Sequence, residues 1–388
     1  MIKKLVDEFD SRCALIHRAL SVGLLTIALS ACGGGGDNSS SAIGSDGTPS
    51  PAGGPTGSAP GNARRSDVAP VAGAFGGGEG QILFVDGGQS SVWQLDLASR
   101  LFRKIAEPNS HWDWSILDGV TRSTTGSFAV LSRKFLGLES QVFVFSADGS
   151  LINATSITYM NGHAVSGAAI SPEGRLVAWV EEDQPGLYSR DYRLFTRLRV
   201  WDIVARLLWS VTIQERPDRD SRDPAYSDSF TAYWTPEGEL KVLAIDGIYD
   251  IDLANLTSRR AKNLALSYPR SPVVGPDGQT LFFQQSRGNV FNGTNHPTIW
   301  SLDPVTDTLT RRSVYSGLGQ FSPAVSPDGQ WLLMTEAVGS YALGILSESR
   351  FVTAVRLSDQ PFDTNGVPNE ILGAQGARFT ADGRVAWF

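Results

Sequence analysis

The chain has 388 residues and a formal net charge of −7, with 41% hydrophobic and 10% aromatic residues. This composition supplies enough apolar side chains for a packed core. The acidic balance, with no basic stripe, argues against nucleic-acid binding, because phosphate contacts need clustered Lys and Arg. The 10 Trp and 41 Gly favour short strands with tight turns over helices.

The first predicted element is a secretory signal over residues 1–31. Residues 19–29 form an apolar run that is too short to span a bilayer, and Arg12 and Arg18 precede it. Of the two cysteines, Cys13 and Cys32, only Cys32 would survive removal of this signal, so we expect no internal disulfide in the mature chain.

The end of this signal, Leu29-Ser-Ala-Cys32, resembles the lipobox of bacterial lipoproteins. The resemblance implies that the thiol of Cys32 receives a diacylglycerol. In that family an Asp directly after the cysteine favours retention at the inner membrane, and here that position is Gly33. The resemblance therefore implies an envelope protein anchored by lipid to the outer membrane and facing the periplasm or the cell surface.

The lipidated cysteine and a linker make up residues 32–75. The linker is rich in Gly, Ser, Pro and Ala and cannot bury enough apolar surface to fold. Its expected reach is about 35–40 Å, which would hold a globular body near, but clear of, the lipid surface.

A repeated unit, a Pro-Asp/Glu-Gly turn followed by a short apolar strand, organises residues 76–388. In this unit proline presets φ at one corner, and glycine takes the left-handed position. Recurrence every 40–60 residues or so is typical of propeller blades. The instances are Ser171-Pro-Glu-Gly174, Thr235-Pro-Glu-Gly238, Gly275-Pro-Asp-Gly278, Ser326-Pro-Asp-Gly329 and, with Ala in place of Pro, Thr380-Ala-Asp-Gly383.

The strands that follow carry a second signal. Three of them end in Asp, at Asp96, Asp252 and Asp303, and a basic strand comes after a short gap. Because the side chain of an Asp at the start of a turn can accept a hydrogen bond from the backbone N–H two residues later, we interpret these residues as turn formers. Together with the repeated turns, this pattern resembles TolB-type propellers, and Trp201-Asp202 is similar to WD-type repeats. TolB carries an extra α/β domain before its propeller, where this chain has a tether.

The predicted fold is an all-β propeller with six blades, although seven remain an alternative. Candidate innermost strands lie near 115–122, 164–170, 229–234, 270–274, 320–325 and 376–380. Both Gln81-Ile-Leu-Phe-Val85 and Arg384-Val-Ala-Trp-Phe388 qualify as the strand after the turn. We expect the C-terminal end to complete the blade that begins near residue 81, which removes an exposed sheet edge.

Loop lengths predict where function lies. In a four-stranded blade the short turns share one face, and the long insertions at 107–114, 132–140, 181–196, 214–228, 285–297 and 358–375 share the other. Long loops on a rigid scaffold are where binding residues concentrate. The candidate binding residues on this long-loop face are His111, Trp112, Trp114, Tyr188, Tyr192, Arg216, Arg219, Arg287 and His296.

No motif indicates an enzyme. The chain has no Gly-x-Ser-x-Gly elbow and no zinc-binding His or Cys spacing, so we predict no catalytic residue, metal or cofactor. Our prediction is a monomeric binding or scaffold lipoprotein of the cell envelope that contacts protein or glycan. The alternative is a hydrolase or lyase whose site is built from scattered residues in the channel, which no spacing rule would reveal.

Overall fold

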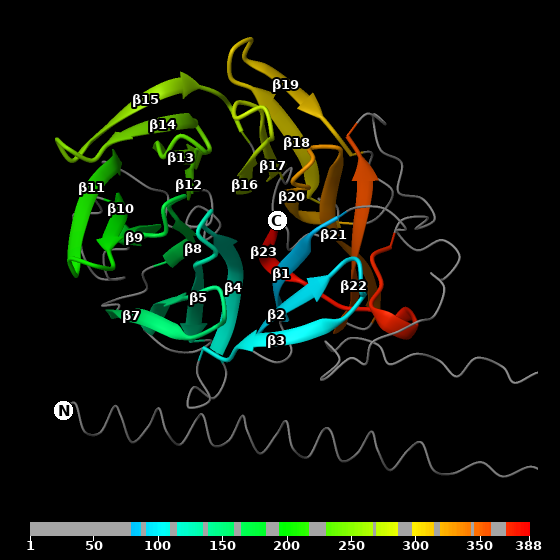
Figure 1. Cartoon of the computed structure of the whole chain (residues 1–388). Coiled ribbons are helices and arrows are strands. Elements are labelled where there is room, and N and C mark those ends of the chain that lie inside the picture. Colours follow the sequence, from blue (N-terminus) through cyan, green and yellow to red (C-terminus); the bar gives the residue numbers. More distant parts are fainter. Residues whose placement is uncertain are drawn as a thin grey trace, which may run out of the picture. The chain divides into compact units, whose positions relative to one another are not determined.

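The computed structural model describes residues 79–86, 91–108, 115–134, 139–158, 164–183, 194–216, 230–266, 269–285, 297–313, 319–342, 345–357 and 370–388. Among these residues, six small antiparallel sheets are arranged around a common axis, as Figure 1 shows. The predicted all-β propeller with six blades is confirmed. Within the same residues, no helix is long and apolar enough to cross a membrane.

Five blades have four described strands each. We number the blades in the chain order of their second strands, and we give the strands of each blade from the innermost to the outermost. Blade 1 contains β23 (Asp382–Trp387), β1 (Gln81–Asp86), β2 (Ser91–Asp96) and β3 (Phe102–Ala106). Blade 2 contains β4 (Ser115–Arg122), β5 (Phe128–Lys134), β6 (Glu139–Phe145) and β7 (Leu151–Thr158). Blade 3 contains β8 (Ala164–Ile170), β9 (Leu176–Asp183), β10 (Leu194–Asp202) and β11 (Leu207–Arg216).

The second half of the ring repeats this plan. Blade 4 contains β12 (Thr231–Trp234), β13 (Leu240–Ala244), β14 (Gly247–Asp252) and β15 (Thr257–Asn263). Blade 5 contains β16 (Arg270–Val274), β17 (Leu281–Gln285), β18 (Thr298–Asp303) and β19 (Thr308–Arg311). Blade 6 has three described strands, β20 (Gly319–Val325), β21 (Trp331–Ala342) and β22 (Ile345–Arg356), and a single bridge joins Thr353 of β22 to Glu370.

The ring closes through the two ends of the described chain. The C-terminal strand β23 pairs antiparallel with β1, with Ile82 opposite Trp387 and Leu83 opposite Ala386. At the end of this pair, Gln81 N donates to Phe388 O at 2.7 Å, and Phe388 N donates to Gln81 O at 3.0 Å. The expectation that the C-terminus completes the blade begun near residue 81 is confirmed.

One detail of that prediction was wrong. Residues 376–380 are not an inner strand: Gly376 ends the short 3₁₀ turn η3 (Ala374–Gly376), and residues 377–380 lie between η3 and β23. Gly383 does not form a turn between two strands; it has a φ of 64° inside β23, where the register with β1 shifts. The same left-handed glycine occurs in β4 at Gly119, which shows that a bulge and a turn can share one sequence signal.

Each blade packs on both neighbours through alternate residues of its strands. In β1, Ile82 and Phe84 contact the cluster shared with blade 6, whereas Leu83 and Val85 contact the cluster shared with blade 2. These side chains are at most 3% exposed. Burying a large aliphatic or aromatic side chain contributes about 1.5–3 kcal/mol, so the six interfaces between blades form the core of the ring.

The Asp residues at the ends of the third strands are turn formers, as predicted. The Oδ1 atom of Asp252 accepts from Ala254 N and Asn255 N, and that of Asp303 accepts from Val305 N and Thr306 N. In the first blade, the same atom of Asp96 accepts from Ser99 N at 2.7 Å.

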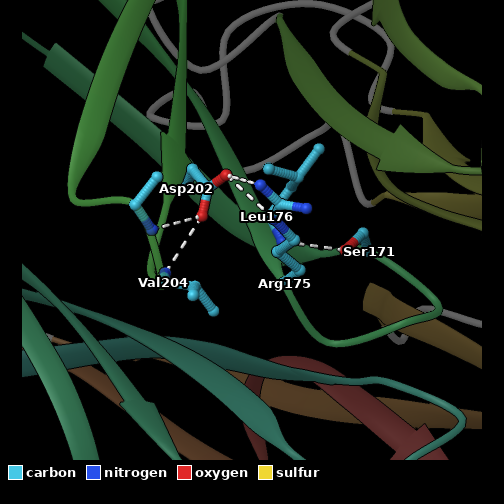
Figure 2. A network of polar contacts seen from close by, with 6 residues as sticks. Ser171, Arg175, Leu176, Asp202 and Val204 are labelled. Carbon is cyan, nitrogen blue, oxygen red and sulfur yellow. Dashed lines mark hydrogen bonds and ion pairs between the residues drawn. The ribbon is translucent and has the colours of Figure 1, made fainter.

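Asp202 adds an ion pair to this arrangement (Figure 2). Its Oδ1 accepts from Val204 N at 3.0 Å and Ala205 N at 2.9 Å, while its Oδ2 accepts from Arg175 Nε at 2.9 Å and Nη2 at 2.6 Å. Arg175 lies in the neighbouring turn, where Ser171 Oγ accepts from Leu176 N. The carboxylate of Asp202 therefore joins two successive turns of blade 3.

Candidate functional site

The antiparallel order of every blade sorts the connections between strands to two faces. The turns between first and second strands, and between third and fourth strands, are short and lie at one end of the ring, which we call the short-turn face. The connections between second and third strands and between blades lie at the opposite end, the long-loop face. The channel along the axis is bounded by the inner strands β23, β4, β8, β12, β16 and β20.

An arginine side chain crosses this channel. Arg384 belongs to the inner strand of blade 1, and its Nη2 donates to Ala232 O, in the inner strand of blade 4, at 2.7 Å. Blade 4 is three blades away in either direction. On the way the guanidinium passes Gly167 of blade 3, where an added Cβ would lie 3.6 Å from the Arg384 Nε. Arg384 is only 8% exposed, so the chain places a buried cation on the channel axis.

A cavity of about 570 Å³ lies between Arg384 and the short-turn face. The ends of all six inner strands contribute to its lining. The walls are mostly apolar and rigid, with five prolines, Pro172, Pro236, Pro272, Pro323 and Pro327, and three aromatic residues, Tyr233, Trp234 and Trp387. Since proline and aromatic side chains lose little conformational freedom, this pocket is formed before any ligand enters.

The polar groups of the cavity are already held in place. Arg122 stacks its guanidinium on the Phe388 ring at 3.5 Å, and burial lowers the pKa of Arg122 from its usual value. Trp234 Nε1 donates to Ala169 O at 3.0 Å. Burial raises the pKa of Tyr233 far above its usual value, so this phenol stays protonated at neutral pH.

The chemistry available in the cavity suits binding more than catalysis. None of the residues that line it is Asp, Glu, His, Asn, Gln or Cys. General acid–base catalysis needs a group that exchanges a proton near neutral pH, and the protonated phenol and the two guanidinium groups do not. Across the described residues, no three His, Cys, Asp or Glu side chains come together as metal ligands. The cavity can hold an apolar or aromatic group of a ligand.

Only one of the candidate binding residues predicted from the sequence, Arg216, belongs to the described part of the chain. Arg216 is the last residue of β11, where its backbone is paired with Leu194 near the long-loop face. The other candidates, together with the lipidation site, lie outside the described residues: Cys32, His111, Trp112, Trp114, Tyr188, Tyr192, Arg219, Arg287 and His296. Their roles stay predictions.

Sequence reasoning missed the cavity, although one signal was present. Ser271-Pro272 and Ser322-Pro323 each stand four residues before a repeated turn, and Ser271 and Ser322 have φ values of 50° and 52°. The left-handed serine marks a bulge in the inner strand, and the proline after it lines the channel. A repeated Ser-Pro at this offset could have located the channel wall.

Comparisons with known proteins give the fold alone. No protein-family model matches the chain, and no curated protein does. A putative TolB from Agrobacterium tumefaciens is similar in structure, with 16% identity, 80% of this chain and 97% of that chain covered, and a TM-score of 0.38. A chain from a Nidogen/Laminin complex gives 12% identity, 79% and 97% coverage and a TM-score of 0.46.

Kuenenia stuttgartiensis hydrazine synthase is a third similar structure, with 17% identity and a TM-score of 0.38. The match covers 61% of this chain and 62% of that one, so the chain spans less than two thirds of the synthase chain. The similarity to TolB-like propellers is thus remote and structural.

Proposed function

We propose that this chain is a non-catalytic binding or scaffold lipoprotein of the cell envelope, which contacts a protein or glycan through its long-loop face. The observation that carries the proposal is the lining of the channel cavity, in which no carboxylate, amide or imidazole side chain occurs. An enzyme with its site in this part of the channel would need several such groups around one point.

The entry point of the chain supports the choice of face. Glu79, the first described residue, accepts from Trp387 Nε1 through its backbone oxygen, and Gly80 lies against Pro327 in a short turn of blade 6. The segment that precedes residue 79 therefore joins the ring at the short-turn face. If Cys32 carries the predicted acyl anchor, the tether leaves from this face and the long-loop face stays accessible to a partner.

The test is site-specific photo-crosslinking in intact cells that express the full chain. A photoreactive residue at position 216 or 287 should capture a protein or glycan, while the same residue at Glu237, on the short-turn face, serves as the matched control. Mass spectrometry of the mature N-terminus should find the acyl chains on Cys32. Equal capture at all three positions would argue against the long-loop face. Turnover of a small ester or glycan with no captured partner would favour the enzyme.

A further inference from the structure

Among the residues that the structure describes, the large hydrophobic side chains that are exposed all lie on one rim. In the described residues, seven large hydrophobic side chains are exposed: Leu151, Ile152, Val204, Leu207, Leu208, Leu256 and Val305. All of them belong to the turn between the third and fourth strands of a blade or to the first two residues of the fourth strand. They come from four consecutive blades, 2 to 5, and all lie at the short-turn end of the ring, where we call them the aliphatic rim.

Two of these residues hold equivalent positions at the tips of their turns. Val204 follows the turn-forming Asp202 by two residues, and Val305 follows Asp303 by two residues. Val204 is 74% exposed and Val305 is 72% exposed. Because successive blades are related by rotation about the axis, equivalent positions lie at one height along it. The tips at Val204 and Val305 therefore lie at one level of the short-turn face, an arrangement that fits a flat apolar boundary.

The rim is densest between blades 2 and 3. Asn153 Nδ2 donates to Ile203 O at 3.3 Å, which brings the start of β7 beside the turn that leads into β11. Leu151 and Ile152 directly precede Asn153 in β7, and Leu207 and Leu208 begin β11 after the turn that contains Ile203. Leaving such side chains in water is unfavourable, and contiguous exposed aliphatics mark an interaction surface.

The charges on the short-turn face indicate which kind of lipid surface the aliphatic rim can approach. Exposed carboxylates outnumber exposed cations in the short turns: Asp148, Glu173, Glu237, Asp277 and Asp328 stand against Arg175 and Arg206. They oppose approach to an anionic bilayer and leave approach to a neutral one unhindered. The chain also enters the ring at this face, through Glu79 and Gly80, so a tether of the predicted length allows the ring to settle on the lipid that anchors it.

We propose that the aliphatic rim docks the propeller, short-turn face down, on a lipid bilayer of neutral headgroups. The docking goes beyond the proposed partner binding and does not require acylation, because the rim residues themselves enter the interface. The cavity above Arg384 then opens toward the bilayer, and the long-loop face points away from it. This orientation fixes which end of the ring a partner can reach.

The test is flotation with phosphatidylcholine vesicles, using the chain from residue 32 onward with Cys32→Ser so that no acyl chain contributes. We expect this protein to bind, with little change between low and high salt, and to bind less as anionic lipid is added. The combined variant Val204→Ser/Leu207→Ser/Leu208→Ser should lower the vesicle partition coefficient by about tenfold or more, since hydrophobic contact scales with buried apolar carbon.

The matched control is Val204→Leu with Val305→Leu, which keeps both tips apolar and should retain binding. Unfolding of every variant in urea shows whether the ring is intact. Absence of vesicle binding by the Cys32→Ser chain, or unchanged binding by the folded serine variant, overturns the proposal. So does a concentration-dependent dimer in sedimentation that the serine substitutions abolish, because the rim would then be an interface between two copies. None of these outcomes depends on whether a partner is captured at the long-loop face or whether Cys32 is acylated.

Discussion

Removing the Asp202 carboxylate should uncouple two neighbouring turns of blade 3. The side chain is 1% exposed, and it accepts two backbone N–H groups and two guanidinium N–H groups (Figure 2). Loss of a side-chain cap of this kind costs about 1 kcal/mol. The Arg175 side chain is 58% exposed, so screening by water limits the ion pair to about 1 kcal/mol or less. We expect Asp202→Ala to lower the free energy of unfolding by about 2 kcal/mol in total.

The assay is urea unfolding followed by tryptophan fluorescence, to which the buried Trp93 and Trp179 contribute. Asp202→Asn keeps the Oδ1 acceptor for the turn and removes the charge, so it should cost about half as much as Asp202→Ala. Asp252→Ala is the matched control, since Asp252 forms the same turn with no arginine partner among its bonds in the structure. It should lose less stability than Asp202→Ala.

The pH dependence follows from the same contacts. The hydrogen bond from Arg175 is the main reason that the pKa of Asp202 lies below its ordinary value of 3.8. Since the folded pKa is lower than the unfolded one, the stabilisation is complete above pH 3.8 and is lost as the pH falls through the folded pKa. The reasoning is refuted if Asp202→Ala and Asp252→Ala lose the same stability at pH 7, or if a cycle with Arg175→Gln gives no coupling.

Three further changes test the packing of the ring by the same urea assay. Gly119→Ala places a Cβ 1.9 Å from a backbone nitrogen of β23 at a φ of 73°, so it should lower the free energy of unfolding by more than about 4 kcal/mol. The control Gly238→Ala, with no atom within 4 Å of the added Cβ, should lower it by about 1 kcal/mol. Equal losses would contradict the close approach of β4 and β23. Leu256→Asn should raise the free energy of unfolding by about 0.5–1 kcal/mol, because Leu256 has a φ of 53° and Asn tolerates this left-handed region. A decrease would mean that the exposed leucine makes a contact that stabilises the fold by more than the backbone strain costs. Arg199→Ala should cost about 2–4 kcal/mol, because the buried Glu181 carboxylate loses its cationic partner and keeps the neutral Trp179 Nε1 donor. Arg199→Lys should recover part of that loss, which a purely steric effect would not predict.

Much of the fold could be predicted because its signals are local. The repeated turns at Gly174, Gly238, Gly278 and Gly329 all have glycine at positive φ, as expected. In each, the turn is closed by a hydrogen bond between residues three apart, for example from Gly174 N to Ser171 O at 2.9 Å. The chemistry that selects Pro, Asp and Gly at these corners acts within one turn, so neighbouring residues suffice to identify it.

The candidate site could not be located in the same way. Its lining gathers residues from all six inner strands, and the cation at its floor, Arg384, is fixed by an oxygen of Ala232 on the opposite blade. No spacing along the chain encodes that meeting, because it depends on the number of blades and on the tilt of each inner strand. The aliphatic rim could not be predicted for a related reason. Nothing in the sequence around Val204 and Val305 shows that the rotation between blades places both exposed side chains at one level.

Neighbouring residues are enough to specify the repeating unit of this protein: a turn formed by proline, an acidic residue and glycine, then an apolar strand, and an aspartate that starts the next turn. Only the pairing of distant strands shows that Asp382–Trp387 is an inner strand and not the strand after a turn. A left-handed glycine can occur in a bulge as well as in a turn between strands. Only the pairing with β1, which comes from the other end of the described chain, distinguishes the two.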